Sequence, residues 1–414
     1  MKRLRVGIFG YGPRGSQLAQ TFMFANCDVV AVCDQRECCR ENAKKELGSD
    51  IAIYKDFDSF IEHDMDAVVL ANYFHEHAQF AIRCFEKDLH VYSECLANGT
   101  MGEGVELIRA FEKSNSVYMI GENYPQMIFN REMRRVCDGG SLGKILYAEG
   151  EYNHPISEDD ARFKQYYIYF REHWRNYLPA TYYVTHSLGP LMWITGAAPK
   201  RVTAFAAFEE YPEDTPTAKR SADRAAIITT QNDDGSVFRV TACSTFGGHH
   251  NAYRICGTNG QIENLRGMDS NIMLRYNSWQ IPNGAKEVNY YEPKWNDKDE
   301  ELIIRSGHGG GDYLTVRMFV ECAVKRIQPE RPYDVYSAVT MSSVAILAHR
   351  SVLNNGQPYD IPDFTSEEYR MQYENDFDTP FYSNGKAPTL WQCSHTDYAP
   401  TEKQLQANDE LCNK

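Results

Sequence analysis

The chain has 414 residues, of which 43% are hydrophobic and 24% charged, and its formal net charge is −14. The length corresponds to roughly two to three domains, and the composition is typical of a soluble globular protein. The acidic balance argues against nucleic acid, whose phosphates need clustered Lys and Arg, and against an anionic membrane surface. A neutral small molecule is the better partner.

Targeting segments and metal sites are also excluded by the pattern. No apolar run approaches the roughly 20 residues that span a bilayer, and the N-terminal residues lead into a strand rather than a secretory segment. The 12 cysteines show no CxxC spacing, and the histidines show no i, i+4 pair. We therefore expect a cytoplasmic protein with reduced thiols and without a metal.

The first ~120 residues alternate short apolar strands with helical patterns, which predicts a parallel sheet with crossover helices. The expected strands are 4–9, 29–33, 67–70, 90–92 and 117–120. The expected helices are 16–25, 37–47, 75–86 and 102–113. This order is typical of a doubly wound Rossmann domain that binds a nucleotide, here 1–122.

A second domain, 123–374, follows with a different pattern. Long alternating runs predict a large, mostly antiparallel open sheet, and they lie at 146–153, 201–208, 225–231 and 238–245. Helices are expected at 313–325 and 337–354, the latter packing back between the domains. From 375 to 414 the chain is polar and reads as a tail or wrapping arm. The fold class is therefore α/β followed by α+β.

A glycine loop after the first strand predicts a dinucleotide site. Its residues are Gly10, Gly12, Pro13, Arg14 and Gly15. The glycines allow a tight turn and close approach of a pyrophosphate to a helix N-terminus. Asp34 follows Gly15 by 19 residues, ends the second strand and can accept hydrogen bonds from a ribose. Its negative charge would repel a 2′-phosphate, so NAD is favoured over NADP, although Arg36 and Arg40 lie near it.

Further segments carry a family resemblance. They include the run from Asn72 to His77, Ser93-Glu94, Glu122-Asn123, the Tyr-x-Thr-His-x-Leu-Gly-Pro segment from Tyr183, and the glycine-rich turn at His308. On these the chain resembles the Gfo/Idh/MocA oxidoreductase family over about residues 3–370. It departs from the usual pattern because Cys95-Leu96 stands where Lys-Pro is usual. The chain is most similar to the branch of NAD-dependent glycoside hydrolases of the α-N-acetylgalactosaminidase type, which also lacks that lysine.

The resemblance implies a reaction that needs several proton-transfer groups. Such enzymes oxidise the sugar at C3, which acidifies the C2 proton and allows β-elimination of the aglycone. Water then adds, and the sugar is reduced again without net redox change. Each positioned proton-transfer group is typically worth about 10²–10⁴ in rate.

The resemblance also assigns roles to individual residues. The implied catalytic residues are Tyr152 as the C2 base, Glu122 and His186 at the leaving group and water, and Tyr183 at O3. The implied substrate-binding residues are Arg175, Tyr253, His308 and His154. The implied cofactor-binding residues outside the glycine loop are Asn72, His77, Glu94 and Asn123.

Simpler structural roles compete with these assignments. Tyr152 and His154 could be packing residues on an alternating strand, and Glu122 could be an acid near a helix start. Arg175 could stack on neighbouring aromatic rings, and His308 could serve a glycine-rich turn. As whole-protein alternatives, the chain could be a conventional NAD-dependent sugar or inositol dehydrogenase in which His186 replaces the lysine, or a non-catalytic sensor. An open sheet leaves a face to cover, so we expect a homodimer or a larger homo-oligomer.

Overall fold

The structure is a computed structural model that describes residues 3–155, 173–213, 221–243, 246–383 and 385–412. It divides into two compact units. Unit 1 comprises Met1–Arg131, Lys294–Ser342 and Asp363–Asp376, and unit 2 comprises Glu132–Pro293, Ser343–Pro362 and Phe377–Lys414. This division differs from the contiguous domains expected from the sequence, because two late segments pack with the N-terminal residues and local patterning does not reveal such contacts.

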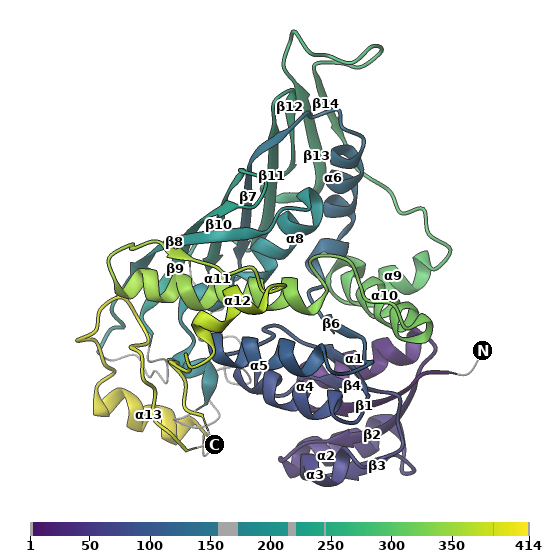
Figure 1. Cartoon of the computed structure of the whole chain (residues 1–414), viewed down its shortest axis with the longest axis vertical. Helices are drawn as coiled ribbons and strands as arrows, with labels where there is room; N and C mark the ends of the chain where they lie inside the picture. Colours follow the sequence, from purple (N-terminus) through teal and green to yellow (C-terminus); the bar gives the residue numbers. More distant parts are fainter. Residues whose placement is uncertain (1–2, 156–172, 214–220, 244–245, 384, 413–414) are drawn as a thin grey trace. The chain divides into compact units, whose positions relative to one another are not determined.

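Unit 1 is built on a six-stranded parallel sheet with the order β3-β2-β1-β4-β5-β6 (Figure 1). The strands are β1 (Arg5–Phe9), β2 (Asp28–Cys33), β3 (Ala52–Tyr54), β4 (Ala67–Leu70), β5 (His90–Ser93) and β6 (Tyr118–Ile120). Strand β4 is buried along its whole length, as expected for a strand covered on both faces. The predicted doubly wound sheet is confirmed, and only the short edge strand β3 is additional.

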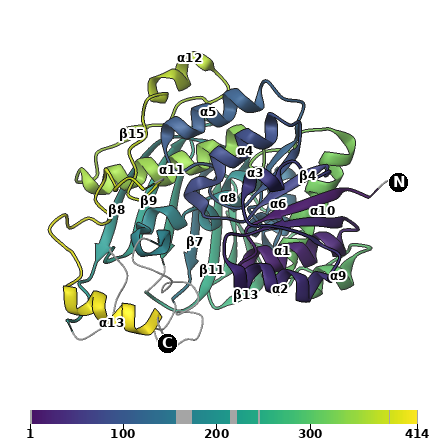
Figure 2. The same cartoon turned by 90° about the horizontal axis from the view of Figure 1, so that it is seen from below.

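The helices of unit 1 connect these strands. They are α1 (Pro13–Phe24), α2 (Glu37–Leu47), α3 (Phe57–Phe60), α4 (His77–Phe85), α5 (Met101–Phe111), α9 (Glu300–Arg305), α10 (Gly311–Lys325) and α12 (Glu367–Arg370), with short turns η1 (Phe74–Glu76), η2 (Tyr124–Gln126), η5 (His308–Gly310) and η6 (Met371–Tyr373). Helix α5 lies beside α4, and α10 lies beside α1 (Figures 1 and 2). A capping box of Thr100 and Glu103 fixes the start of α5.

Unit 2 contains a nine-stranded sheet with the order β14-β13-β12-β11-β7-β10-β9-β8-β15. The strands are β7 (Ile145–Asn153), β8 (Pro199–Phe208), β9 (Asp223–Asn232), β10 (Val237–Cys243), β11 (His250–Gly257), β12 (Gly260–Leu265), β13 (Met268–Tyr276), β14 (Val288–Tyr291) and β15 (Tyr359–Asp360). The β7–β10 pair is parallel and the others are antiparallel. The prediction of a mostly antiparallel open sheet is confirmed; residues 244–245 of the expected strand 238–245 lie outside the described residues.

Helix α8 (Thr185–Thr195) covers one face of this sheet at β7. A Cβ on Gly150 would lie 2.1 Å from the carbonyl oxygen of Ser187, so only glycine permits this close approach. The remaining helices are η3 (Trp174–Tyr177), η4 (Ala180–Tyr183) and α13 (Glu402–Cys412), while the division between the units falls within α6 (Ile128–Asp138) and α11 (Val335–Leu353).

Residues 377–412, here called the C-terminal arm, fold onto unit 2. Ser394 donates from its backbone nitrogen and its hydroxyl to the Asp223 carboxylate, at 2.8 and 2.6 Å. The Gln404 amide donates to the Pro212 carbonyl at 2.8 Å. The expected tail or arm is therefore anchored by side-chain contacts. Among the described helices, none combines the length and apolarity needed to cross a membrane.

Candidate functional site

The glycine loop of unit 1 has the shape that its sequence predicts. Gly10 has a φ of 89°, and a Cβ on it would lie 2.5 Å from the Ala71 carbonyl oxygen at the end of β4. A Cβ on Gly15 would lie 1.9 Å from the Gly10 carbonyl oxygen. Pro13 occupies the first turn of α1, where its missing N–H costs nothing. The loop is a bare backbone cradle at a helix N-terminus, which fits a pyrophosphate.

Asp34 follows β2 at the edge of this loop. One carboxylate oxygen accepts a hydrogen bond from the Tyr11 backbone nitrogen at 2.8 Å, and the other accepts from the Arg36 nitrogen at 2.8 Å. A carboxylate offers about four acceptor positions, so ribose hydroxyls still have acceptors here. The guanidinium of Arg36 lies 3.5 Å from Asp34, which leaves this arginine beside the same site.

Asp312 is the centre of a polar network in unit 1. Its carboxylate accepts from Arg14 at 2.9 Å, from Asn123 at 2.6 Å and from His308 at 2.9 Å. Arg14 also donates to Glu94 at 2.9 Å. Three of the residues assigned to cofactor or substrate thus meet at the Asp312 carboxylate, and Glu94 joins them through Arg14. Asp312 itself was not among the predicted site residues.

The hydrogen-bond partners of Asp312 keep its carboxylate ionised. Its side chain is 0% exposed, and this burial opposes ionisation. The Arg14 charge and the hydrogen bonds from His308 and Arg14 outweigh burial and hold the pKa of Asp312 well below its usual range. The network therefore fixes the Arg14 end of the glycine loop with a permanent buried ion pair.

Glu122 lies at the end of β6 and is fully buried. Its carboxylate accepts from the Tyr124 backbone nitrogen at 3.2 Å and contacts the Cys95 thiol at 3.4 Å. Cys95, at the position of the usual lysine, thus lies against one of the predicted catalytic acids.

His77 and Asn72 both lie next to backbone segments at the carboxyl end of the parallel sheet. The His77 ring is 1% exposed and its Nδ1 lies 2.7 Å from the Leu96 carbonyl oxygen. Burial lowers the pKa of His77 to about 4, so the ring is neutral at pH 7. Asn72 directly follows the Ala71 carbonyl that Gly10 approaches. This contact ties His77 to the segment after Glu94, and its contact with the cofactor stays a prediction.

A cluster of rings in unit 2 gathers most of the predicted catalytic residues. Tyr152 and Tyr183 stack with centroids 5.5 Å apart and an interplanar angle of 3°. The His186 ring meets Tyr152 edge-on at 4.8 Å and Tyr183 at 6.2 Å. We call Tyr152, Tyr183 and His186 the ring cluster. It brings two phenols and an imidazole, all capable of proton transfer, onto the α8 face of β7.

Two predicted substrate residues border the ring cluster. Arg175 in η3 lies 3.5 Å from the Tyr183 hydroxyl and also stacks on Trp174, so the stacking alternative for this residue describes part of its contacts. The His154 ring lies 5.6 Å from that of Tyr152, and its Nδ1 is 2.9 Å from Nδ1 of His249. A cation and an imidazole pair thus lie beside the phenols.

Tyr253, predicted to bind substrate, contacts the backbone of His186. Its hydroxyl donates to the backbone carbonyl of His186 at 2.5 Å, and the residue is 1% exposed. Its backbone nitrogen donates to the Asn264 side chain at 2.7 Å, and Asn264 in turn donates to the Asn251 carbonyl at 2.7 Å. This hydrogen bond holds the backbone of His186. Substrate binding by Tyr253 stays a prediction.

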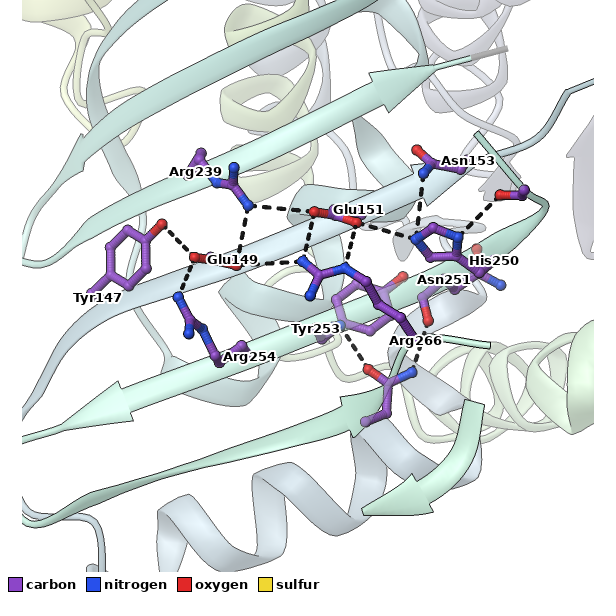
Figure 3. A network of polar contacts seen from close by, with 12 residues as sticks. Tyr147, Glu149, Glu151, Asn153, Arg239, His250, Asn251, Tyr253, Arg254 and Arg266 are labelled. Carbon is purple, nitrogen blue, oxygen red and sulfur yellow. Dashed lines mark hydrogen bonds and ion pairs between the residues drawn. The ribbon is translucent and has the colours of Figure 1, made fainter. Parts of the chain in front are cut away.

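The opposite face of β7 carries a charged network (Figure 3). Side chains alternate along a strand, so Glu149 and Glu151 point away from the face that Gly150 presents to α8. Their carboxylates accept from Tyr147, Arg239, Arg254, Arg266 and His250. Burial opposes ionisation of Glu149, but the Tyr147 hydrogen bond and the arginines hold its pKa below the usual value. The network links β7, β10 and β11 and is separate from the ring cluster.

Two family models together match most of the chain. Residues 131–371 match the family described as "Glycosyl hydrolase 109, C-terminal domain". Residues 4–122 match "Oxidoreductase family, NAD-binding Rossmann fold". The first match alone covers more than half of the chain, and the second confirms a nucleotide-binding domain of the NAD-binding type.

Relatives extend over both units. A glycosyl hydrolase family 109 protein from Saccharopolyspora erythraea is 26% identical over 403 residues, covering 89% of this chain and 85% of that protein. An α-N-acetylgalactosaminidase from Shewanella oneidensis is 25% identical over 401 residues, covering 88% and 86%.

Solved structures share the fold. Levoglucosan dehydrogenase in complex with NADH and levoglucosan superimposes with a TM-score of 0.70 at 18% identity, over 87% of this chain and 100% of that one. A myo-inositol 2-dehydrogenase from Lactobacillus plantarum gives 0.66 at 19% identity, over 87% and 100%. Together with the family matches, these findings confirm the predicted enzyme class. The chain belongs to the glycosyl hydrolase 109 family, the NAD-dependent glycoside hydrolase branch of the Gfo/Idh/MocA enzymes.

Proposed function

We propose that the protein hydrolyses a glycoside of a neutral sugar by transient oxidation at C3, elimination of the aglycone, addition of water and reduction, without net redox change. The observation that carries this proposal is the ring cluster, in which Tyr152, Tyr183 and His186 meet within 6.2 Å between ring centroids. The name of the Shewanella oneidensis relative suggests terminal N-acetylgalactosamine as the first sugar to test.

NAD is the proposed cofactor, and when bound it takes a hydride from the sugar and returns it. The Gly10–Gly15 turn would hold the pyrophosphate, and Asp34 would accept hydrogen bonds from the adenosine ribose. The Asp34 charge disfavours a 2′-phosphate, which supports NAD over NADP. The ion pairs of Arg14 with Glu94 and Asp312, and the Asn123 hydrogen bond, hold this end of the loop in place.

The side chains are proposed to share the proton transfers. Tyr152 removes the C2 proton; an ordinary phenol has a pKa near 10, so it needs polar partners, and Tyr183, His186 and His154 are its ring neighbours. Tyr183 takes the proton from O3, with Arg175 beside its hydroxyl. His186 and Glu122 serve the leaving group and the incoming water. Arg175, His154 and His308 bind substrate hydroxyls.

A conventional sugar dehydrogenase is the second candidate. The names of the dehydrogenases that share the fold support it, and His186 beside Tyr183 could replace the missing lysine. The position of Cys95, where that lysine is usual, favours the hydrolase.

Incubation with α- and β-glycosides in D₂O distinguishes the two. We expect free sugar that carries deuterium at C2, detected by mass spectrometry, with no net NADH absorbance. Stoichiometric NADH with an intact glycosidic bond would overturn the hydrolase and favour the dehydrogenase.

The domain roles, the cellular location and the oligomeric state are part of the same proposal. We propose residues 1–122 as the cofactor domain and 123–374 as the substrate domain, in a cytoplasmic protein. The ten cysteines whose side chains the structure describes are free thiols, which supports a reducing compartment.

A homo-oligomer through the open sheet face is supported by Phe205 and Ile227, cross-strand neighbours that are 63% and 40% exposed. Light scattering after size exclusion would test the oligomeric state.

A further inference from the structure

The C-terminal arm lines a cavity, and nine of the ten lining residues lie beyond the segment 131–371 that matches the glycosyl hydrolase 109 model. The cavity has a volume of about 500 Å³, within the usual range for small-molecule sites. Four aromatic side chains line it, namely Tyr177, Tyr382, Trp391 and Tyr398. Tyr177 comes from η3, and the other three come from the arm. We call it the arm pocket.

The walls of the arm pocket are held in place by contacts within unit 2. The Tyr177 and Tyr382 rings pack edge to face with centroids 4.9 Å apart. Buried His349 lies 2.7 Å from the Trp391 carbonyl oxygen, which fixes the backbone under the Trp391 side chain. Three residues after Trp391, Ser394 is bound to Asp223. The pocket is thus preformed, which reduces the entropy cost of binding.

The chemistry of the lining favours an uncharged ligand with flat apolar faces and polar edges. Among the ten lining residues, all of them described, none carries a formal charge. The Trp391 side chain is 58% exposed, an accessible aromatic surface at the rim. Gln392 uses its amide nitrogen on the Pro380 and Leu390 carbonyls, at 3.4 and 3.2 Å, and no described donor contacts its carbonyl oxygen. A pyranose combines C–H faces that pack on aromatic rings with hydroxyls that hydrogen-bond to such an oxygen.

The arm pocket is linked to the ring cluster by the short helix η3. Tyr177, in the pocket wall, is two residues from Arg175, whose guanidinium is 3.5 Å from the Tyr183 hydroxyl. The pocket wall and the Arg175 contact with Tyr183 thus share one short helix.

We propose that the arm pocket binds a neutral pyranose unit in the aglycone of an oligosaccharide substrate. The inference rests on the proposed glycoside hydrolysis for its link to turnover, whereas binding at the pocket is independent of turnover. A pyranose site in the arm pocket predicts that the enzyme prefers oligosaccharide substrates over glycosides of a single sugar with a small aglycone.

Ligand-observed NMR with the whole protein tests binding without any reaction. The probes are the neutral oligosaccharides lacto-N-tetraose, chitotriose and maltotriose, and the variants are Trp391→Ala and Gln392→Ala. The His349 contact is to the Trp391 backbone, so W391A keeps this anchor. Trp279→Ala is the matched control, since Trp279 is 79% exposed elsewhere in unit 2.

We expect at least one oligosaccharide to bind the wild type and W279A, with affinity about tenfold lower in W391A and a smaller loss in Q392A. The ratio of kcat/KM for an oligosaccharide to that for a p-nitrophenyl glycoside of the same terminal sugar should fall in W391A by a similar factor. Equal binding by W391A and wild type, binding of none of the probes, or displacement of the sugar by an uncharged apolar peptide would overturn the proposal. Probe binding without any glycoside turnover would count against the proposed function and leave the pocket assignment standing.

Discussion

Asp312 in unit 1 and Tyr152 in unit 2 each lie at the centre of a cluster of predicted site residues, but different forces hold the two clusters. Around Asp312 the contacts are charge-assisted hydrogen bonds from Arg14 and His308, joined by Asn123. Around Tyr152 they are ring contacts with Tyr183 and His186.

The difference bears on what each cluster can do. The ionic network lowers the pKa of Asp312 and so keeps its charge constant over the working pH range. Such a group anchors a loop but does not exchange protons. The ring contacts leave hydroxyls and ring nitrogens able to donate or accept. We therefore assign cofactor positioning to the Asp312 network and proton transfer to the ring cluster.

The largest expected effect is on catalysis by Tyr152→Phe. Removing the proposed C2 base while keeping its ring should lower kcat by about 10²–10⁴, with little change in melting temperature. Loss of deuterium incorporation at C2 is the specific measurement. Tyr147→Phe is the matched control, because Tyr147 lies on the same strand but belongs to the Glu149 network on the other face. Full C2 exchange in Y152F would remove Tyr152 from the mechanism.

Asp312→Ala should give the next largest effect, on the stability of unit 1. Removing one partner of a buried ion pair typically costs about 3–5 kcal/mol. Hydrogen exchange of α10 and of the glycine loop measures this loss locally. Glu301→Ala is the control, since the Glu301–Arg305 pair is exposed and such pairs contribute at most about 1 kcal/mol. Similar exchange rates in the two variants would show that the Asp312 network does not hold the loop.

The parts of the site that the sequence predicted are those with local signatures. The glycine loop and Asp34 follow strand, turn and helix within 30 residues, so spacing alone locates them. The spacing of Tyr183 and His186 is likewise local, and the family resemblance placed them with Tyr152. The structure brings their rings together, and their roles stay predictions.

The features that the sequence did not predict depend on contacts between segments that are far apart in the chain. Asp312 meets Arg14 across 298 positions, which no local pattern shows. Tyr253 lies in Ala-Tyr-Arg on β11, a strand not recognised because its burial does not alternate regularly. The C-terminal arm has little periodic structure and is held by scattered side-chain contacts such as the two hydrogen bonds from Ser394 to Asp223, so composition suggested only a tail or an arm.

Both units should lose stability in mild acid, through one buried histidine each. His77 in unit 1 and His349 in unit 2 are 1% exposed, and burial lowers the pKa of each to about 4. In the unfolded chain a histidine titrates near 6.5. Between pH 6.5 and 4 the unfolded state thus binds a proton that the folded state does not. The free energy of unfolding should fall by on the order of 2 kcal/mol per histidine at pH 5.

Urea unfolding at pH 7 and pH 5 measures this loss. His77→Gln and His349→Gln should each reduce the difference between the two pH values, and His395→Gln, at an exposed position, should leave it unchanged. A pH dependence that is identical in all three variants would contradict the assignment to the buried histidines.

The smallest expected effect is that of Tyr253→Phe. This variant tests whether the hydrogen bond from Tyr253 to the His186 backbone positions the His186 ring in the ring cluster. The variant keeps the buried ring and removes the hydrogen bond to the His186 carbonyl, worth about 1 kcal/mol. If Tyr253 acts by positioning His186, KM should stay constant while kcat falls about threefold to tenfold and the pH profile of kcat shifts. Tyr276→Phe, at a residue that is 7% exposed in the same sheet, controls for loss of a tyrosine hydroxyl and should change neither constant. A rise in KM with constant kcat would instead restore Tyr253 as a substrate contact, and the ring cluster would then need another residue to hold His186.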